Sequence, residues 1–168
     1  MIYYSTFIVI YEDTDLPEVE FFCPSLWEIE DIKITGDYYY TNAERRWNML
    51  DLIKRDKEEM YMGFALDIYR KESLISKTME VDALKEYVRQ FENNWFAHDH
   101  FKTIKIPAVA QLTFVSDSLQ EYEDFLDTTY RFLEHTSGCI INVLAQEYDA
   151  AEFHSLFIEN KFSYKQES

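Results

Sequence analysis

The pattern of apolar and polar positions between residues 107 and 144 predicts a strand, a helix and a second strand with short connections. Ala108 to Val115 is a largely apolar run rich in β-branched residues, which predicts a strand buried on both faces. Ser118 and Glu121 have the spacing of a capping box, in which each side chain bonds a free amide at a helix start. A second apolar run, Cys139 to Leu144, predicts another strand. The pattern therefore predicts a βαβ unit whose two strands are parallel and share a sheet.

The helix of this unit is expected to run from Ser118 to Thr136. Gly138 is expected to take the left-handed conformation that ends a helix. Apolar residues recur at steps of three and four, and two phenylalanines widen the face that they form. The predicted buried face consists of Leu119, Tyr122, Phe125, Leu126, Tyr130, Phe132 and Leu133.

The pattern in the first part of the chain predicts mainly strands. Ile2 to Tyr11 predicts a strand, and Val19 to Cys23 a short antiparallel partner for it. Glu28 to Thr35 alternates imperfectly and predicts a third strand. Met60 to Tyr69 has the clearest period of two and predicts a half-buried strand. One side would contain Met60, Met62, Phe64, Leu66 and Ile68, and the other Tyr61, Gly63, Ala65, Asp67 and Tyr69. Between these two predicted strands a capping box at Thr41 predicts a helix, whose apolar face would contain Ala43, Trp47, Leu50 and Ile53.

Two further helices are predicted from capping residues. Asp82 would begin one of them, and Asp149 would begin the last. Lys161 to Ser168 is expected to be a frayed tail. The apolar face of the Asp149 helix would contain Phe153, Leu156 and Phe157. The order of elements predicts a single α/β or α+β domain over residues 1–168, with antiparallel N-terminal strands, later helix–strand alternation and a mixed β-sheet.

Charge limits the classes of partner. The chain has 168 residues, with 32 acidic and 16 basic side chains and a formal net charge of −16. Such a surface repels phosphate, so we expect neither nucleic acid nor an anionic membrane as a partner. It suits a basic protein, or it keeps the protein soluble.

Cysteine usage and the N-terminus suggest a cytoplasmic protein. Cys23 and Cys139 are far apart and neither lies in a metal-binding spacing, which predicts free buried thiols, with one disulfide as the alternative. The first residues have no basic region and no small-residue cleavage site, so no signal peptide is expected.

His98 and His100 are the candidate metal ligands. In an extended segment the two imidazoles project to the same side, a spacing that can bind a transition metal. A third ligand would have to come from elsewhere in the chain, for example Glu134, His135 or His154. The alternative is two loop histidines without a ligand, and no other cofactor is indicated.

The Ser118 helix carries many acidic residues, and Glu121, Asp124 and Asp127 are its candidate partner-binding residues. Their spacing of three places them on one side of the helix. Such a side can dock a basic protein, with charge raising the association rate. The alternative is an acidic surface that only promotes solubility.

Three functions remain open, because no stretch matches a catalytic motif. The leading hypothesis is a non-enzymatic acidic binding protein, such as an inhibitor or immunity-type protein that docks a basic partner. The second is an enzyme or small-ligand-binding protein, metal-dependent if the histidines bind metal, with a pocket beside the late strands. The third is a scaffold or self-associating subunit.

Overall fold

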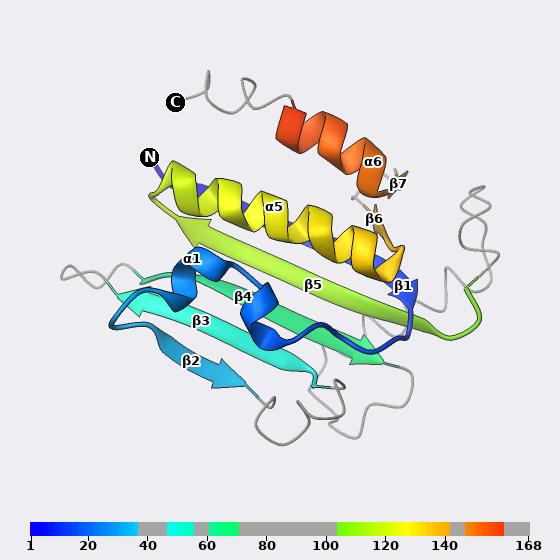
Figure 1. The fold of residues 1–168 in the computed structure, drawn as a ribbon, viewed down its shortest axis with the longest axis horizontal. Helices are drawn as coiled ribbons and strands as arrows, with labels where there is room; N and C mark the ends of the chain where they lie inside the picture. Colours follow the sequence, from blue (N-terminus) through cyan, green and yellow to red (C-terminus); the bar gives the residue numbers. More distant parts are fainter. Residues whose placement is uncertain (37–46, 56–60, 71–103, 142–146, 160–168) are drawn as a thin grey trace.

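The computed structural model describes residues 1–36, 47–55, 61–70, 104–141 and 147–159. Within these ranges seven strands form one sheet in the order β2-β3-β4-β5-β1-β6-β7, and the helices lie on one of its faces (Figure 1). This arrangement confirms the predicted α+β class. The strands are β1 (Tyr3–Glu12), β2 (Lys33–Gly36), β3 (Met49–Arg55), β4 (Tyr61–Arg70), β5 (Pro107–Ser116), β6 (Cys139–Ile141) and β7 (Glu147–Tyr148). The helical elements are η1 (Val19–Phe21), α1 (Pro24–Trp27), α5 (Leu119–Thr136), α6 (Ala150–Phe153) and the π-helical η3 (His154–Glu159).

The predicted strand–helix–strand unit is β5, α5 and β6. Both strands pair antiparallel with β1, which lies between them, so they run parallel to each other in one sheet as predicted. The expectation of a mixed sheet was wrong for the described strands, because all of their pairings are antiparallel. Because β1 lies between β5 and β6, these two parallel strands do not pair with each other.

Two predicted elements of the first part of the chain were wrong. Val19 to Cys23 is not a strand, because β5 and β6 already occupy both edges of β1. The segment forms η1 and leads into α1 instead. The helix predicted from Thr41 was wrong where the structure describes it, since Met49 to Arg55 is β3, paired with β2 and β4. The predicted strands at 28–35 and 60–69 correspond to β2 and β4, although β2 contains only Lys33–Gly36.

The core lies between the sheet and the helices and is largely aromatic. Phe125 of α5 is fully buried and stacks on Phe114 of β5, with ring centroids 4.9 Å apart. Phe7 of β1 also stacks on the Phe125 ring, with centroids 5.7 Å apart, and the centroid of Phe64 of β4 lies 6.0 Å from that of Phe125. Phe22, which follows η1, stacks on Phe64 from the side of α1. These rings join β1, β4, β5 and both parts of the helix layer.

The ends of α5 follow the sequence signals with one exception. Ser118 accepts a hydrogen bond from the Glu121 amide at 3.3 Å, which confirms it as the N-cap. At the other end Ser137, not Gly138, is left-handed, with φ of 53°. Gly138 is packed closely against β1 instead, because a Cβ there would lie 2.8 Å from a methyl group of Val9. Its small size is therefore needed for packing and not for its backbone conformation.

The last helix begins as predicted, and its apolar face differs from the prediction. Asp149 accepts a hydrogen bond from the Glu152 amide at 2.8 Å. Phe153 is fully buried and stacks on Phe157, whereas Leu156 is 45% exposed and does not belong to the buried face. The predicted Asp82 helix and the tail at 161–168 lie outside the described residues. No helix in the described ranges is long and apolar enough to cross a membrane.

Candidate functional site

The candidate metal ligands His98 and His100 lie outside the described residues. The two other histidines, His135 and His154, are described and are far from forming a ligand set. The His154 ring contacts Tyr130 and Glu159, while His135 lies beside Phe21. Within the described ranges no group of three or more His, Cys, Asp or Glu side chains could hold a metal ion. The role of His98 and His100 stays a prediction.

Two of the three candidate partner-binding acids of α5 form bonds within the protein. Glu121 forms an ion pair with Lys54 of β3 and accepts a hydrogen bond from the Ser116 hydroxyl at 2.5 Å. Asp124 accepts hydrogen bonds from the backbone amide and the hydroxyl of Ser25, at 3.1 and 2.7 Å. These carboxylates therefore attach α5 to β3 and to the start of α1.

Asp127, the third candidate, is exposed on α5. Glu134, seven residues or about two turns further along α5, is exposed as well, and both carboxylates lie close enough to Tyr130 to affect it. Desolvation raises the pKa of the Tyr130 hydroxyl, and Glu134 and Asp127 raise the pKa further because they disfavour a phenolate. The group therefore stays protonated at neutral pH.

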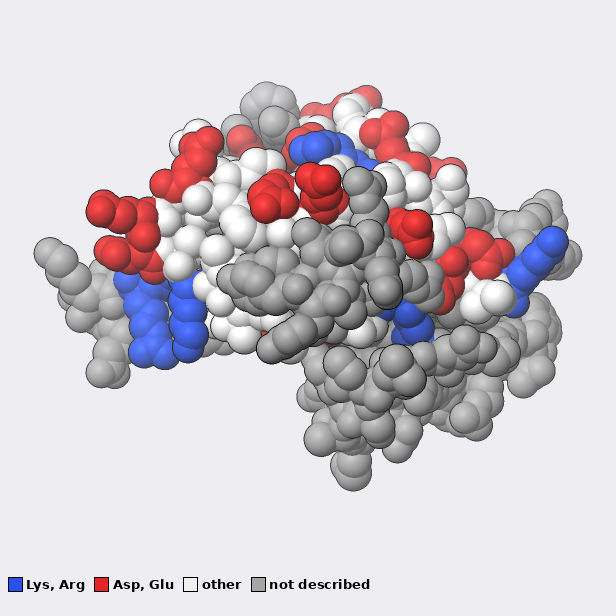
Figure 2. Space-filling model, turned by 60° about the horizontal axis from the view of Figure 1, so that its bottom comes forward, with Lys and Arg blue, Asp and Glu red and all other residues white. Residues whose placement is uncertain are grey.

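These acids belong to a larger surface of the helix layer, here called the acidic helix surface. Its members are exposed carboxylates on the loop around η1 and on α5, α6 and η3: Glu18, Glu20, Asp127, Glu134, Glu152 and Glu159. Figure 2 shows more acidic than basic side chains over the described part of the face that it presents.

The described basic groups of this layer are held by neighbours within the chain. Arg131 lies over the Phe21 ring, with its guanidinium carbon 4.5 Å from the ring centroid. Lys54, which reaches the layer from β3, is paired with Glu121. A cation over an aromatic face is attracted by the ring's quadrupole and loses part of its hydration. The charge of Lys54 is balanced by Glu121, and Arg131 is the one Lys or Arg side chain of α5, where Asp127 and Glu134 are both exposed.

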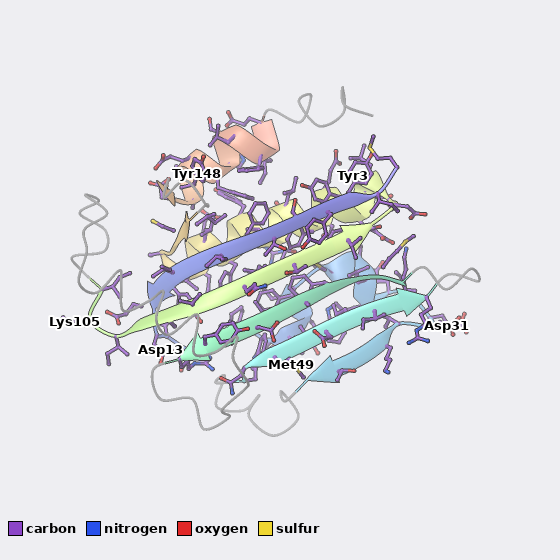
Figure 3. The ribbon with its side chains drawn as sticks, turned by 180° about the vertical axis from the view of Figure 1, so that it is seen from behind. Tyr3, Asp13, Asp31, Met49, Lys105 and Tyr148 are labelled. Atoms are coloured by element: carbon purple, nitrogen blue, oxygen red, sulfur yellow. The ribbon has the colours of Figure 1, made fainter. Side chains whose placement is uncertain are left out.

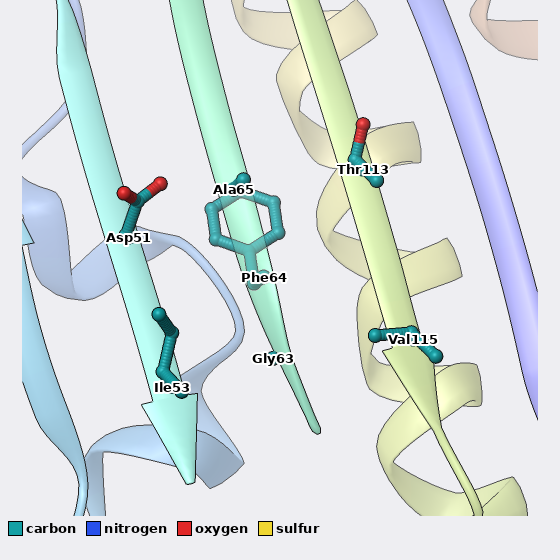
Figure 4. Close-up of a pocket in the computed structure, with 7 residues that line it drawn as sticks. All are labelled: Asp51, Ile53, Gly63, Phe64, Ala65, Thr113 and Val115. Carbon is teal, nitrogen blue, oxygen red and sulfur yellow. The ribbon is translucent and has the colours of Figure 1, made fainter. Parts of the chain in front are cut away.

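The opposite side of the sheet contains a small hollow that is easily missed from the sequence. It is centred on β4, where Gly63 and Ala65 leave a depression between the longer side chains of β3 and β5 (Figure 4). Its volume is about 180 Å³. The lining residues are Asp51, Ile53, Gly63, Phe64, Ala65, Thr113 and Val115. The sequence signal was present in the two small residues at alternate positions of β4, but their neighbours could not be known without the strand register.

Register arranges the hollow in two rows across the three strands. Asp51 lies opposite Ala65, which lies opposite Thr113, so that a carboxylate and a hydroxyl flank a methyl group. In the adjacent row Ile53 and Val115 flank Gly63. This side of the sheet faces the viewer in Figure 3, with the described helices behind it. One end of the hollow is therefore polar and the other apolar.

Arg70, the last residue of β4, is a buried arginine that bonds two neighbouring segments. Arg70 is 4% exposed, and its Nε donates a hydrogen bond to Asp13 at 3.1 Å. Its Nη1 donates to the carbonyl of Trp47 at 3.1 Å and to the side chain of Asn48. The contacts join the segment after β1 to the segment that enters β3. They give Arg70 a structural role that the sequence did not indicate.

Cys23 does not provide a reactive thiol. Both cysteines are free and buried, as predicted. Burial raises the pKa of the Cys23 thiol well above its usual value, and the charge of Asp124 raises it further. The thiolate that would act as a nucleophile is therefore strongly disfavoured at Cys23.

A comparison with known protein families, curated proteins and solved structures finds no match to this chain.

Proposed function

We propose that the protein is a non-enzymatic binding protein that docks a basic protein partner on the acidic helix surface. The observation that carries the proposal is that acidic side chains of the helix layer are exposed, whereas its described basic side chains contact neighbours within the chain. Asp127 and Glu134 are exposed, while Arg131 and Lys54 are held by Phe21 and by Glu121. Carboxylates of this kind attract a basic surface over distances of about a Debye length and raise its association rate.

The partner would be cationic and would act in the same compartment, which we take to be the cytoplasm. An inhibitor or immunity-type protein that covers a basic surface of its target is the form of this role that we favour. Glu121 and Asp124 contribute to it indirectly. Through their bonds to Lys54 and Ser25 they hold α5 in place, and α5 carries the exposed acids.

The test compares partner capture by three proteins. The first is the wild type, and the second carries Asp127→Asn with Glu134→Gln, which removes two charges from the acidic helix surface. The third carries Ile2→Lys with Ile106→Lys, at two exposed positions just before β1 and β5 and outside the helix layer. This control raises the net charge by the same amount outside the acidic helix surface. All three should retain wild-type stability, because exposed substitutions change it by less than about 0.5 kcal/mol.

Each protein is used to capture partners from the native host, and the association rate of the captured protein is then measured at low and high salt. We expect a basic protein whose association slows several-fold with the Asp127 and Glu134 variant and becomes less dependent on salt. The control should resemble the wild type. Equal slowing by both variants would show that only net charge matters. A partner that is bound equally by all three would contradict the proposal.

A further inference from the structure

We propose that the hollow on β3, β4 and β5 is a binding site for a primary alkylammonium group. The proposal is independent of the function proposed above, because the hollow lies on the side of the sheet opposite α5. Four features support it: the size of the hollow, its two-row arrangement, the hydrogen-bonding capacity of its polar atoms and the distribution of charge around it.

Size excludes most ligand classes. Pockets for nucleotides and drug-sized ligands have volumes of about 300–1,000 Å³, whereas this hollow has about 180 Å³. A cavity of about 150 Å³ holds a molecule the size of benzene. The hollow therefore fits one short chain or one amino-acid side chain.

Its shape favours a linear ligand. β3 and β5 lie on either side of β4, so their side chains form two walls about 10 Å apart. Gly63 and Ala65 form the floor, and Ile53 and Val115 are the apolar walls at one end (Figure 4). A methylene chain over Gly63 would contact both of these walls.

The polar end can only accept hydrogen bonds. Thr6 donates its hydroxyl proton to the Tyr4 hydroxyl at 3.0 Å. The 3.2 Å bond between Thr6 and Thr113 therefore uses the proton of Thr113, since each hydroxyl has one proton to give. The oxygen of Thr113 then presents lone pairs to the hollow, opposite the carboxylate of Asp51.

An ammonium group has three donors and no acceptor, so it complements both polar atoms. A carboxylate has four lone-pair sites, so Asp51 can accept from a ligand in addition to its contacts within the chain. A hydroxyl ligand has one donor and no charge, so it could bond only one of the two acceptors at a time and would lack the Coulombic attraction to Asp51. An anionic ligand would be repelled.

Charge around the hollow gives the ligand one orientation. Lys33 of β2 lies opposite Ile53 in the sheet. Arg55 ends β3 two residues beyond Ile53, and both basic side chains are exposed. Arg55 and Asp51 are four residues apart, which is about 13 Å along a strand. A cationic group is therefore favoured beside Asp51 and disfavoured at the other end.

The chemistry is shared by free alkylamines and by the side chain of lysine. The probes are butylammonium chloride for the first source and a lysine blocked at both backbone ends for the second. Binding is followed by amide chemical shifts at constant ionic strength and neutral pH. Butan-1-ol, butyrate and ammonium chloride are the controls for charge, for its sign and for the carbon chain.

We expect shifts at the amides of β3, β4 and β5 around the hollow and a dissociation constant of about 1 mM for butylammonium, as is usual for a ligand of five heavy atoms. Butan-1-ol and ammonium chloride should bind at least about tenfold more weakly, and butyrate should not bind. If the blocked lysine binds equally well, the site recognises lysine side chains; if only butylammonium binds, the ligand is a free amine. Either result supports the proposal.

Three variants test the residues. Asp51→Asn keeps the shape and should weaken butylammonium binding at least about tenfold, because a hydrogen bond to a charged group is lost. Ala65→Leu should abolish binding by filling the floor, and Asp127→Asn on α5 should have no effect. Thr113→Val removes the second acceptor at the polar end and should also weaken butylammonium binding. The amide spectrum of each variant shows whether it is folded. Equal binding of butan-1-ol and butylammonium, or unchanged binding by Asp51→Asn, would overturn the proposal. Neither result bears on the acidic helix surface.

Discussion

Removal of the Phe125 ring should be among the most destabilising single changes in the described part of the protein. The side chain is fully buried between Phe114, stacked at 4.9 Å, and Phe7, stacked at 5.7 Å. Phe→Ala substitutions in cores cost about 3–5 kcal/mol. We expect Phe125→Ala near the upper end, because its neighbours are flat rings held by β1 and β5 that cannot close the cavity. Stacked ring pairs add about 0.5–1.5 kcal/mol to their burial.

Urea unfolding followed by circular dichroism is the assay. With a denaturant slope of about 2 kcal/mol per molar, a loss of 4 kcal/mol lowers the midpoint by about 2 M. Phe21→Ala is the matched control, since Phe21 is only partly buried, and it should cost about 1–2 kcal/mol. A loss below about 1 kcal/mol for Phe125→Ala, or one equal to that of Phe21→Ala, would refute the reasoning that Phe125 joins the sheet to α5.

Three further predictions follow from the described contacts. Arg70→Met should cost about 3–5 kcal/mol, because it breaks a largely buried ion pair with Asp13 by removing one of its two charges; calorimetry should show a large fall in Tm, and an unchanged Tm would contradict this. Gly63→Ala should destabilise the protein by more than about 1 kcal/mol, because the added Cβ would overlap the carbonyl oxygen of Leu52; urea unfolding measures the loss, which a stabilised variant would disprove. Glu12 accepts hydrogen bonds from the amides of residues 105 and 106, at 2.9 and 2.7 Å, and these bonds lower its pKa in the folded protein. Its contribution is therefore present above the pKa of the unfolded chain and is lost as the pH falls through the lower, folded value. Glu12→Gln should reduce stability at pH 7 by up to about 1 kcal/mol and have no effect at a pH below that folded value; a loss that stays constant with pH would show that the charge is unimportant.

Local signals in the sequence predicted the β5–α5–β6 unit well. The N-cap at Ser118 depends on a neighbour three residues away, and the buried face of α5 depends on spacings of three and four. Such features need no knowledge of the rest of the fold. The same holds for β4, whose alternation is visible within its own ten residues.

The failures arose where partners distant in sequence decided the structure. The segment with Leu50 and Ile53 has a spacing of three that fits a helix, yet pairing with β2 and β4 makes it a strand. For β1 the sequence suggested a nearby partner, while the structure gives it β5 and β6. No local pattern contains that information.

The candidate sites were less predictable than the fold. An acidic α5 was evident from composition, but the bonds of Glu121 to Lys54 and of Asp124 to Ser25 depend on how β3 and α1 pack on it. The hollow around Gly63 requires the register of three strands. Sites assembled from several strands become visible only when the strands are placed side by side.

The position of β1 between β5 and β6 has a consequence for how the protein folds during synthesis. β1 precedes the other described strands in the chain, and its partners are residues 107–116 and 139–141. Contacts between such distant segments slow folding, because a long loop must close before they form. On the ribosome the apolar residues of β1 stay unpaired until β5 and β6 have been made. Chaperones that shield exposed apolar strands should therefore raise the yield of this protein most when they act early in translation.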